Sequence, residues 1–139
     1  MKFNPYLNFP GTAEDAFNFY KSVFGGDFLM VQRFKNMPDA DKLPPGVAQM
    51  IMHISLPLNN DTILMGSDAP AQMGFKVIAG NNNYISVSPD SREQADMLFN
   101  GLSAGGQVEM PIADTFWGAY FGSFTDKFGT KWMINFQQS

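Results

Sequence analysis

His53 is the only histidine in the chain and the residue best suited to acid–base chemistry. An imidazole has an unperturbed pKa of about 6.5, so it can accept or donate a proton at neutral pH. His53 lies in the alternating run 50–56, which predicts a strand with the imidazole on its less apolar face. A lone histidine with no carboxylate nearby in sequence is also typical of a hydrogen-bonding wall residue, so both roles stay open.

Two charged residues at strand ends are further candidates for chemistry. Asp68 follows the predicted strand 62–65 and could orient His53, bind a ligand cation or form a turn. Arg33 ends the predicted strand 28–34, where a guanidinium could hold a ligand carboxylate or phosphate, or form a surface ion pair. We predict His53 and Asp68 as candidate catalytic residues and Arg33 as a ligand-binding residue.

These side chains must be positioned by helices and strands, and the clearest of these elements is a helix over residues 13–24. Thr12 can act as its N-cap, and apolar residues recur along it at three- and four-residue spacing. A pair of glycines ends the helix. Alternating residues predict one strand before it, at 6–9, and another after it, at 28–34.

The same pattern returns about 78 to 80 residues later, which indicates an internal repeat. Residues 84–87 predict a strand, and Asp90 with Glu93 forms a capping box for a second amphipathic helix. A second pair of glycines ends that helix. In this alignment Tyr84 falls on Tyr6.

Each half of the chain closes with further strands. The predicted strands are 50–56 and 62–65 in the first half, and 119–124 and 131–136 in the second. Residues 35–48 form a long loop, of a length that is often functional, and residues 69–82 form a linker. The sequence therefore predicts one α+β domain, 1–139, with two strand–helix–strand–strand–strand modules, at about 1–68 and about 83–139.

Alternation along the strands separates two faces of each predicted sheet. Leu7, Met52 and Trp132 are assigned to an apolar face that packs on the helices. The other face mixes hydroxyls, amides and one imidazole with apolar groups, as ligand pockets do, although it could also be a solvated sheet surface. The residues of this mixed face are Tyr6, Asn8, Ile51, His53, Ser55, Tyr84, Ser86, Met133 and Asn135.

The chain is rich in large flexible and aromatic side chains, with 14 Phe and 10 Met. They are consistent with a bulky core or with an apolar pocket lined by adaptable methionines. Trp117 could stack on a planar ligand, or pack in the core or in a dimer interface. The predicted ligand-binding residues are Tyr6, Asn8, Arg33, Ser55, Tyr84, Ser86, Trp117, Met133 and Asn135.

Composition argues against several classes of protein. The net charge is −4 and no run of Lys or Arg is present, so no nucleic-acid partner is expected. The N-terminal residues show no signal peptide and no apolar window is long enough for a membrane span, so we expect a cytoplasmic location. The absence of cysteine excludes disulfides, thiolate metal sites and cysteine nucleophiles.

Several motifs in order resemble the PhnB-like branch of the glyoxalase/bleomycin-resistance superfamily, also called the vicinal oxygen chelate fold. The motifs are Pro5-Tyr6-Leu7-Asn8-Phe9, Ala13-Glu14-Asp15-Ala16, Phe19-Tyr20, Phe24-Gly25-Gly26, Met52-His53, Gly66-Ser67-Asp68, Trp117-Gly118 and Asp126-Lys127-Phe128-Gly129-Thr130-Lys131-Trp132. The resemblance covers nearly the whole chain. It implies two βαβββ modules whose curved mixed sheets surround a cavity, commonly in a homodimer.

Enzymes of that superfamily usually hold a divalent metal with His, Gln or Glu from four strands. The resemblance places those ligands near Pro5 or Tyr6, near Gly66, near Asn82 or Asn83 and near Met133. None of these residues is a histidine or a carboxylate, and a thioether is a poor ligand for hard cations. We therefore predict no cofactor and no usual four-ligand metal site, and an atypical divalent metal stays open.

Two functions remain open from the sequence, beside the plainer possibility of a dimeric protein whose cavity is closed and whose role lies elsewhere. The first is a small-molecule-binding protein, like the bleomycin-resistance members, that holds a partly apolar or aromatic ligand without chemistry. The second is a lyase, isomerase or dioxygenase type of enzyme, which uses His53 as acid/base or an unusual metal set such as His53 and Asp68. The name 3-demethylubiquinone methyltransferase, common for PhnB-like chains, gains no support, because no glycine-rich loop for S-adenosylmethionine follows a parallel strand.

Overall fold

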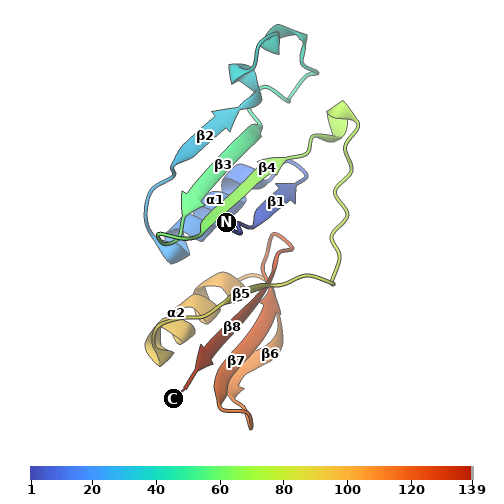
Figure 1. Cartoon of the computed structure of the whole chain (residues 1–139). Coiled ribbons are helices and arrows are strands. Elements are labelled where there is room, and N and C mark those ends of the chain that lie inside the picture. Colours follow the sequence, from blue (N-terminus) through green and yellow to red (C-terminus); the bar gives the residue numbers. More distant parts are fainter. Residues whose placement is uncertain (139) are drawn as a thin grey trace. The chain divides into compact units, whose positions relative to one another are not determined.

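The structure is a computed structural model that describes residues 1–138 (Figure 1). The chain divides into two compact units, of which one is Met1–Ile78 and the other begins at Ala79. Each unit contains a four-stranded mixed sheet and one α-helix. No helix within residues 1–138 has the length and apolar character that a membrane span requires.

The first unit follows the predicted order of one strand, a helix and three strands. Its elements are β1 (Tyr6–Phe9), α1 (Ala13–Phe24), β2 (Met30–Arg33), β3 (Ile51–Pro57) and β4 (Ile63–Asp68), with 3-10 helices at Phe34–Asn36, Ala40–Lys42 and Ala71–Met73. The strand order is β1-β4-β3-β2. Strand β1 runs parallel to β4, and the other pairs are antiparallel.

The second unit repeats this topology. Its elements are β5 (Ile85–Val87), α2 (Arg92–Ser103), β6 (Gln107–Asp114), β7 (Ala119–Thr125) and β8 (Lys131–Gln137). The strand order is β5-β8-β7-β6, and β5 is again parallel to its neighbour. The predicted α+β class with two βαβββ modules is confirmed.

In each unit the helix packs on one face of the sheet, and a glycine makes this contact close. A Cβ on Gly66 of β4 would lie 2.7 Å from Cε1 of Phe17, and one on Gly122 of β7 would lie 2.6 Å from Cε2 of Phe99. The helix-facing rows of both sheets are apolar, and Ile54, Leu56, Phe124, Trp132 and Ile134 are each at most 2% exposed. We call the opposite, helix-free side of each sheet its open face.

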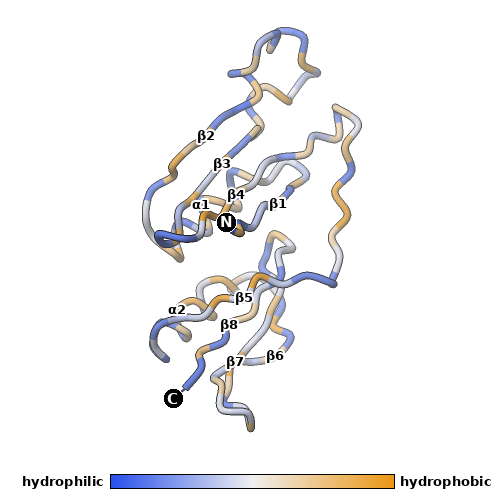
Figure 2. Tube along the Cα trace, in the orientation of Figure 1, coloured by the Kyte–Doolittle hydropathy of each residue, from blue (hydrophilic) through white to orange (hydrophobic). Residues whose placement is uncertain are grey.

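The segment that joins the two units carries apolar residues outside any core. Phe75 is 54% exposed and Ile78 is 79% exposed, and the stretch appears orange along the strand-free connection in Figure 2. Residues 69–82, the predicted linker, contain only the short 3-10 helix Ala71–Met73 before β5 begins.

The sequence missed β6, which starts immediately after the second pair of glycines. Its register against β7 shifts twice, between Val108 and Met110 and between Met110 and Ala113. Pro111 lies inside the strand, a residue found on edge strands because it cannot donate to a ladder. Two irregularities and an internal proline remove the alternation from which a strand is predicted.

Three local predictions also need correction. Ser91, not Asp90, caps α2, because its hydroxyl accepts the backbone N–H of Gln94. Thr12 precedes α1 without a side-chain capping bond. Ile51, assigned to the mixed face, is 1% exposed. Gln32 pairs with His53, but the next residue, Arg33, pairs with Ile51, so Met52 has no partner on β2. This bulge breaks the alternation of side chains along β3.

The ladder pairs also define which positions of the two units are equivalent. Met65 of β4 and Met133 of β8 occupy the same place, and their partners on the parallel edge strand are Tyr6 and Ser86. Tyr6 is therefore equivalent to Ser86, two residues beyond the Tyr84 of the sequence alignment. The shift by two keeps each residue on its predicted face, because side chains alternate with a period of two.

Candidate functional site

The open face of the first unit gathers most of the candidates predicted there. One row across the sheet runs Tyr6, Met65, Ser55, Met30, as the ladder registers place them. The next row on the same face contains two pairs. Asn8 of β1 lies opposite Ser67 of β4, and His53 of β3 lies opposite Gln32 of β2. Predicted residues from β1 and β3 thus share one surface, together with methionines, Ser67 and Gln32, which the sequence analysis did not select.

Tyr6 and His53 form the most specific pair on this face. The Tyr6 hydroxyl lies 3.1 Å from Nδ1 of His53, and the two rings stack with centroids 5.6 Å apart and planes 28° from parallel. Among residues 1–138 nothing else is hydrogen bonded to the imidazole, so Nε2 is free to meet a ligand. Beside the pair, the Ser67 hydroxyl donates to Oδ1 of Asn8 over 3.3 Å.

Asp68 lies on the opposite side of the sheet from His53. Its carboxylate is buried and accepts two backbone N–H groups, one from Ala13 at the start of α1 and one from Ile51, each at 2.9 Å. A carboxylate at the N-terminus of a helix is favoured by the helix dipole. Asp68 therefore joins α1 to β3, and the predictions that it orients His53 or shares a metal with it are wrong.

Arg33 is engaged by its own chain. Its guanidinium pairs with both oxygens of Glu14 on α1 and also donates to the backbone oxygen of Gln49 at 2.7 Å. The hydrogen bonds from Arg33 lower the pKa of Glu14 below its usual value. Of the two roles predicted for Arg33, ligand binding and an ion pair, the structure contains the ion pair.

The open face of the second unit carries a charged cluster that the sequence analysis did not single out. The Lys131 ammonium lies 2.7 Å from Oε2 of Glu109 and donates to the Thr125 hydroxyl at 2.9 Å. The Tyr84 hydroxyl donates to the same carboxylate, at 3.0 and 3.2 Å from its two oxygens. Lys131 could have been found by alternation with Trp132, but Glu109 lies in the strand that the sequence did not predict.

The contacts of Glu109 predict a pH-dependent contribution to stability. The hydrogen bond from Lys131 lowers the pKa of Glu109 below its usual 4.5 against the opposing effect of burial, and the hydrogen bond from Tyr84 lowers it further. A depressed pKa stabilises the fold above the unfolded-state value, and this stabilisation is lost as the pH falls through the folded-state value. We expect Glu109→Gln to unfold at lower urea concentration than wild type at pH 7 and at the same concentration well below pH 4.5. A difference that persists at low pH would contradict this account.

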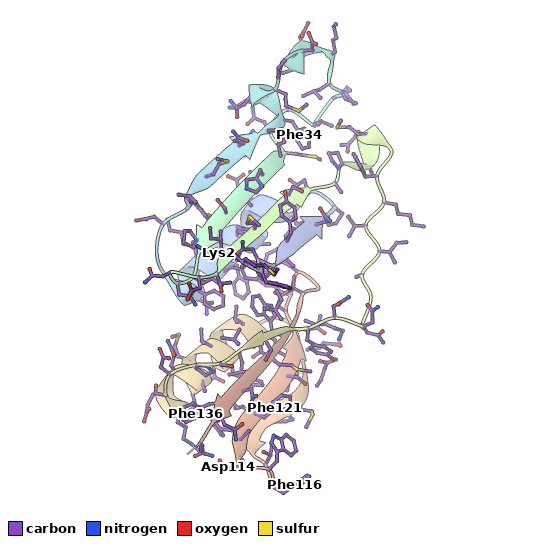
Figure 3. The ribbon with its side chains drawn as sticks, viewed as in Figure 1. Lys2, Phe34, Asp114, Phe116, Phe121 and Phe136 are labelled. Carbon is purple, nitrogen blue, oxygen red and sulfur yellow. The ribbon has the colours of Figure 1, made fainter. Side chains whose placement is uncertain are left out.

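The other candidates of the second unit occupy two places. Ser86 and Met133 are paired on the open face, and Asn135 follows Met133 on the same side. The Asn135 Oδ1 is enclosed and has no hydrogen-bond partner among residues 1–138. Trp117, 50% exposed, lies instead in the turn after β6, where it contacts the rings of Phe116 and Phe121. Figure 3 labels these two phenylalanines.

Comparison with known proteins fits this arrangement. A family model described as 3-demethylubiquinone-9 3-methyltransferase matches residues 1–135. Protein YjdN of Escherichia coli is 31% identical, with 97% of this chain and 95% of that protein covered. The crystal structure of protein PA1353 from Pseudomonas aeruginosa shares 36% identity at a TM-score of 0.87, covering 100% of this chain and 99% of the other.

This chain belongs to the PhnB-like family. A Bacillus cereus structure described as a putative 3-demethylubiquinone-9 3-methyltransferase, PhnB protein, is 26% identical with a TM-score of 0.79 over 98% of this chain and 99% of its own. A glyoxalase/bleomycin resistance protein from Albidiferax ferrireducens has a TM-score of 0.66 at 16% identity, over 97% of each chain. The fold is thus that of the glyoxalase/bleomycin-resistance group.

The residues of this PhnB-like chain do not fit the metal that the fold group often carries. Within residues 1–138 no three His, Cys, Asp or Glu side chains gather as a metal site would require. Near the expected ligand positions stand Tyr6, Gly66 and Met133, and thioethers are poor partners for hard cations. His53 and Asp68 lie on opposite sides of their sheet, so they cannot replace the missing ligands.

The N-terminus of α1 is occupied by the protein's own chain. In dinucleotide-binding folds a glycine-rich turn leaves a helix N-terminus free to receive an anionic group. Here the first N–H of α1 already bonds the buried carboxylate of Asp68 at 2.9 Å. The helix start is therefore closed by a negative charge of the protein itself.

Proposed function

We propose that this protein binds a small, partly aromatic molecule on the open faces of its sheets and holds it without the four-ligand metal site. The observation that carries the proposal is the Tyr6–His53 pair, a ring stack with a fixed hydrogen bond and one free ring nitrogen. An aromatic surface with one directional polar group is the usual make-up of a small-molecule site.

The surroundings of the pair support a ligand that is mainly apolar. Met30 is 42% exposed and Tyr6 is 45% exposed, so apolar surface on this face is open to a ligand. Asn8 and Ser67 provide a small polar edge beside it. We further propose that the protein acts as a homodimer, as the resemblance to the superfamily implies.

Ligand capture tests the proposal. A small-molecule library is screened against the wild-type protein by mass spectrometry, and the captured compound is titrated against variants. We expect His53→Ala to weaken binding about tenfold, since it removes both ring contact and hydrogen bond. Tyr6→Phe, which keeps the ring and loses the hydroxyl, should cost about threefold.

Lys35→Ala, at an exposed residue of the 3-10 helix Phe34–Asn36, is the matched control and should leave the affinity unchanged. Capture that is equally strong in wild type and His53→Ala would place the ligand elsewhere and contradict the proposal. Variant folding is checked by the urea midpoint, so that a loss of binding is not a loss of structure.

One observation also supports catalysis by the same face. The Tyr6 hydroxyl holds Nδ1 of His53, which leaves Nε2 as the nitrogen that could exchange a proton with a ligand. In that case the captured compound is converted by the wild type and is not converted by His53→Gln. A compound that stays unchanged after prolonged incubation with wild type would restrict the protein to binding.

A further inference from the structure

The two open faces contain the same row of three residues. In the first unit Ser55 of β3 lies between Met65 of β4 and Met30 of β2. In the second unit Ser123 of β7 lies between Met133 of β8 and Met110 of β6. The strands are equivalent in the two sheets, so the row Met–Ser–Met is repeated at the same place in each.

Both serines lie deep, and neither hydroxyl is used by the protein. Ser55 is 3% exposed and Ser123 is 5% exposed. Within residues 1–138 neither hydroxyl has a hydrogen-bond partner. The fully enclosed side-chain atom without a partner in these residues is Oδ1 of Asn135, so neither serine Oγ is fully enclosed. Each hydroxyl is therefore a polar group at the surface of the open face that a ligand can contact.

The methionines on either side of each serine are open. Met30 and Met110 are 42% and 48% exposed, and Met65 and Met133 are half-buried. Thioethers are flexible and polarizable and make favourable contacts with aromatic rings, often at the ring edge. A hydroxyl between two thioethers thus matches a flat ring that carries one hydrogen-bonding substituent.

We infer that each sheet has one such ring seat, defined as Met30, Ser55 and Met65 in the first unit and Met110, Ser123 and Met133 in the second. The ligand class is a planar aromatic with a single hydroxyl or equivalent group, and the chain has two seats for it. This inference rests on the proposed function and makes it more specific.

The test uses the full chain with methionine methyl groups labelled with ¹³C and titrated with 2-naphthol. We expect two equivalents to bind per chain and to shift the methyl signals of the four seat methionines. Met97, 50% exposed on α2, should not shift. Ser55→Ala should weaken binding about fivefold at the Met30 and Met65 signals only, the effect of one hydrogen bond.

Ser123→Ala should do the same at the Met110 and Met133 signals only. 2-Methoxynaphthalene, which has the same rings and no O–H donor, should bind each seat about fivefold more weakly than 2-naphthol does, because it cannot donate to the serine hydroxyl. Met97→Leu is the matched control and should change neither affinity. The urea midpoint of each serine variant confirms that it is folded.

Other outcomes separate this inference from the proposed function. Binding of a single equivalent, or shifts that include Met97 as much as the seat methionines, would overturn the paired seats. The proposed function would still hold if the ligand captured from the library depends on His53. If no methyl signal shifts and no compound is captured from the library, both the paired seats and the proposed function are contradicted.

Discussion

Asp68→Ala should lower the free energy of unfolding by about 3 kcal/mol, because it leaves two buried backbone donors without an acceptor. The carboxylate receives the N–H groups of Ala13 and Ile51, each at 2.9 Å, and the residue is 5% exposed. Water cannot easily replace an acceptor at such depth. Urea unfolding at pH 7, followed by circular dichroism, measures the change.

Asp68→Asn is the comparison variant. Its amide keeps one carbonyl acceptor, but its NH2 group faces the second backbone N–H, a donor against a donor, so this variant should also lose about 2 kcal/mol or more. If instead Asp68→Ala leaves the urea midpoint unchanged but abolishes ligand binding, Asp68 belongs to the functional site after all, and the structural role assigned to it is wrong. The prediction thus separates a fold-holding carboxylate from a catalytic one.

Gly106→Ala should be equally damaging, at about 3 kcal/mol, for a steric reason. A Cβ at this position would lie 2.1 Å from the backbone oxygen of Thr125 and 2.9 Å from backbone carbons of Asp126. These are main-chain atoms, so no side chain can turn away to make room. The edge strand β6 would have to separate from β7, which is measured as a lower urea midpoint and faster amide exchange in both strands.

Gly80→Ala provides the comparison. A Cβ on Gly80 would meet only Oδ1 of Asn82, at an ordinary 3.6 Å, so the free energy of unfolding should stay within about 0.5 kcal/mol of wild type. A Gly106→Ala variant as stable as Gly80→Ala would mean that the contact between β6 and β7 is looser than the structure has it.

These glycines illustrate what a local pattern can and cannot reveal. The sequence interpreted Gly105-Gly106 as a pair that ends the second helix. Gly105 has a φ of 78°, the left-handed conformation typical of such an ending. Gly106 is required for a different reason, the approach of a strand about 20 residues away in the chain. That approach exists only in the folded sheet, so no helix-ending rule could have indicated it.

The candidate site shows the same division. Alternation correctly put Tyr6 and His53 on one face, because side-chain direction follows from strand geometry alone. The hydrogen bond between them depends on β1 pairing in parallel with β4 while β4 pairs with β3, contacts between segments 47 residues apart. Asp68 lies beyond the predicted strand 62–65, so alternation assigns it no face, and the ladder with Phe9 places it on the helix side.

The sequence by itself determined the duplicated βαβββ order, the two amphipathic helices and the apolar face of each sheet, since these follow from residue periodicity along a short stretch of chain. Only the tertiary structure decided which strands are neighbours. That choice brought Tyr6 to His53, gave Asp68 to the backbone of α1 and β3, and set a serine between two methionines in both sheets. The physical reason is that register between distant strands is fixed by packing and hydrogen bonding across the whole sheet, which no local pattern encodes.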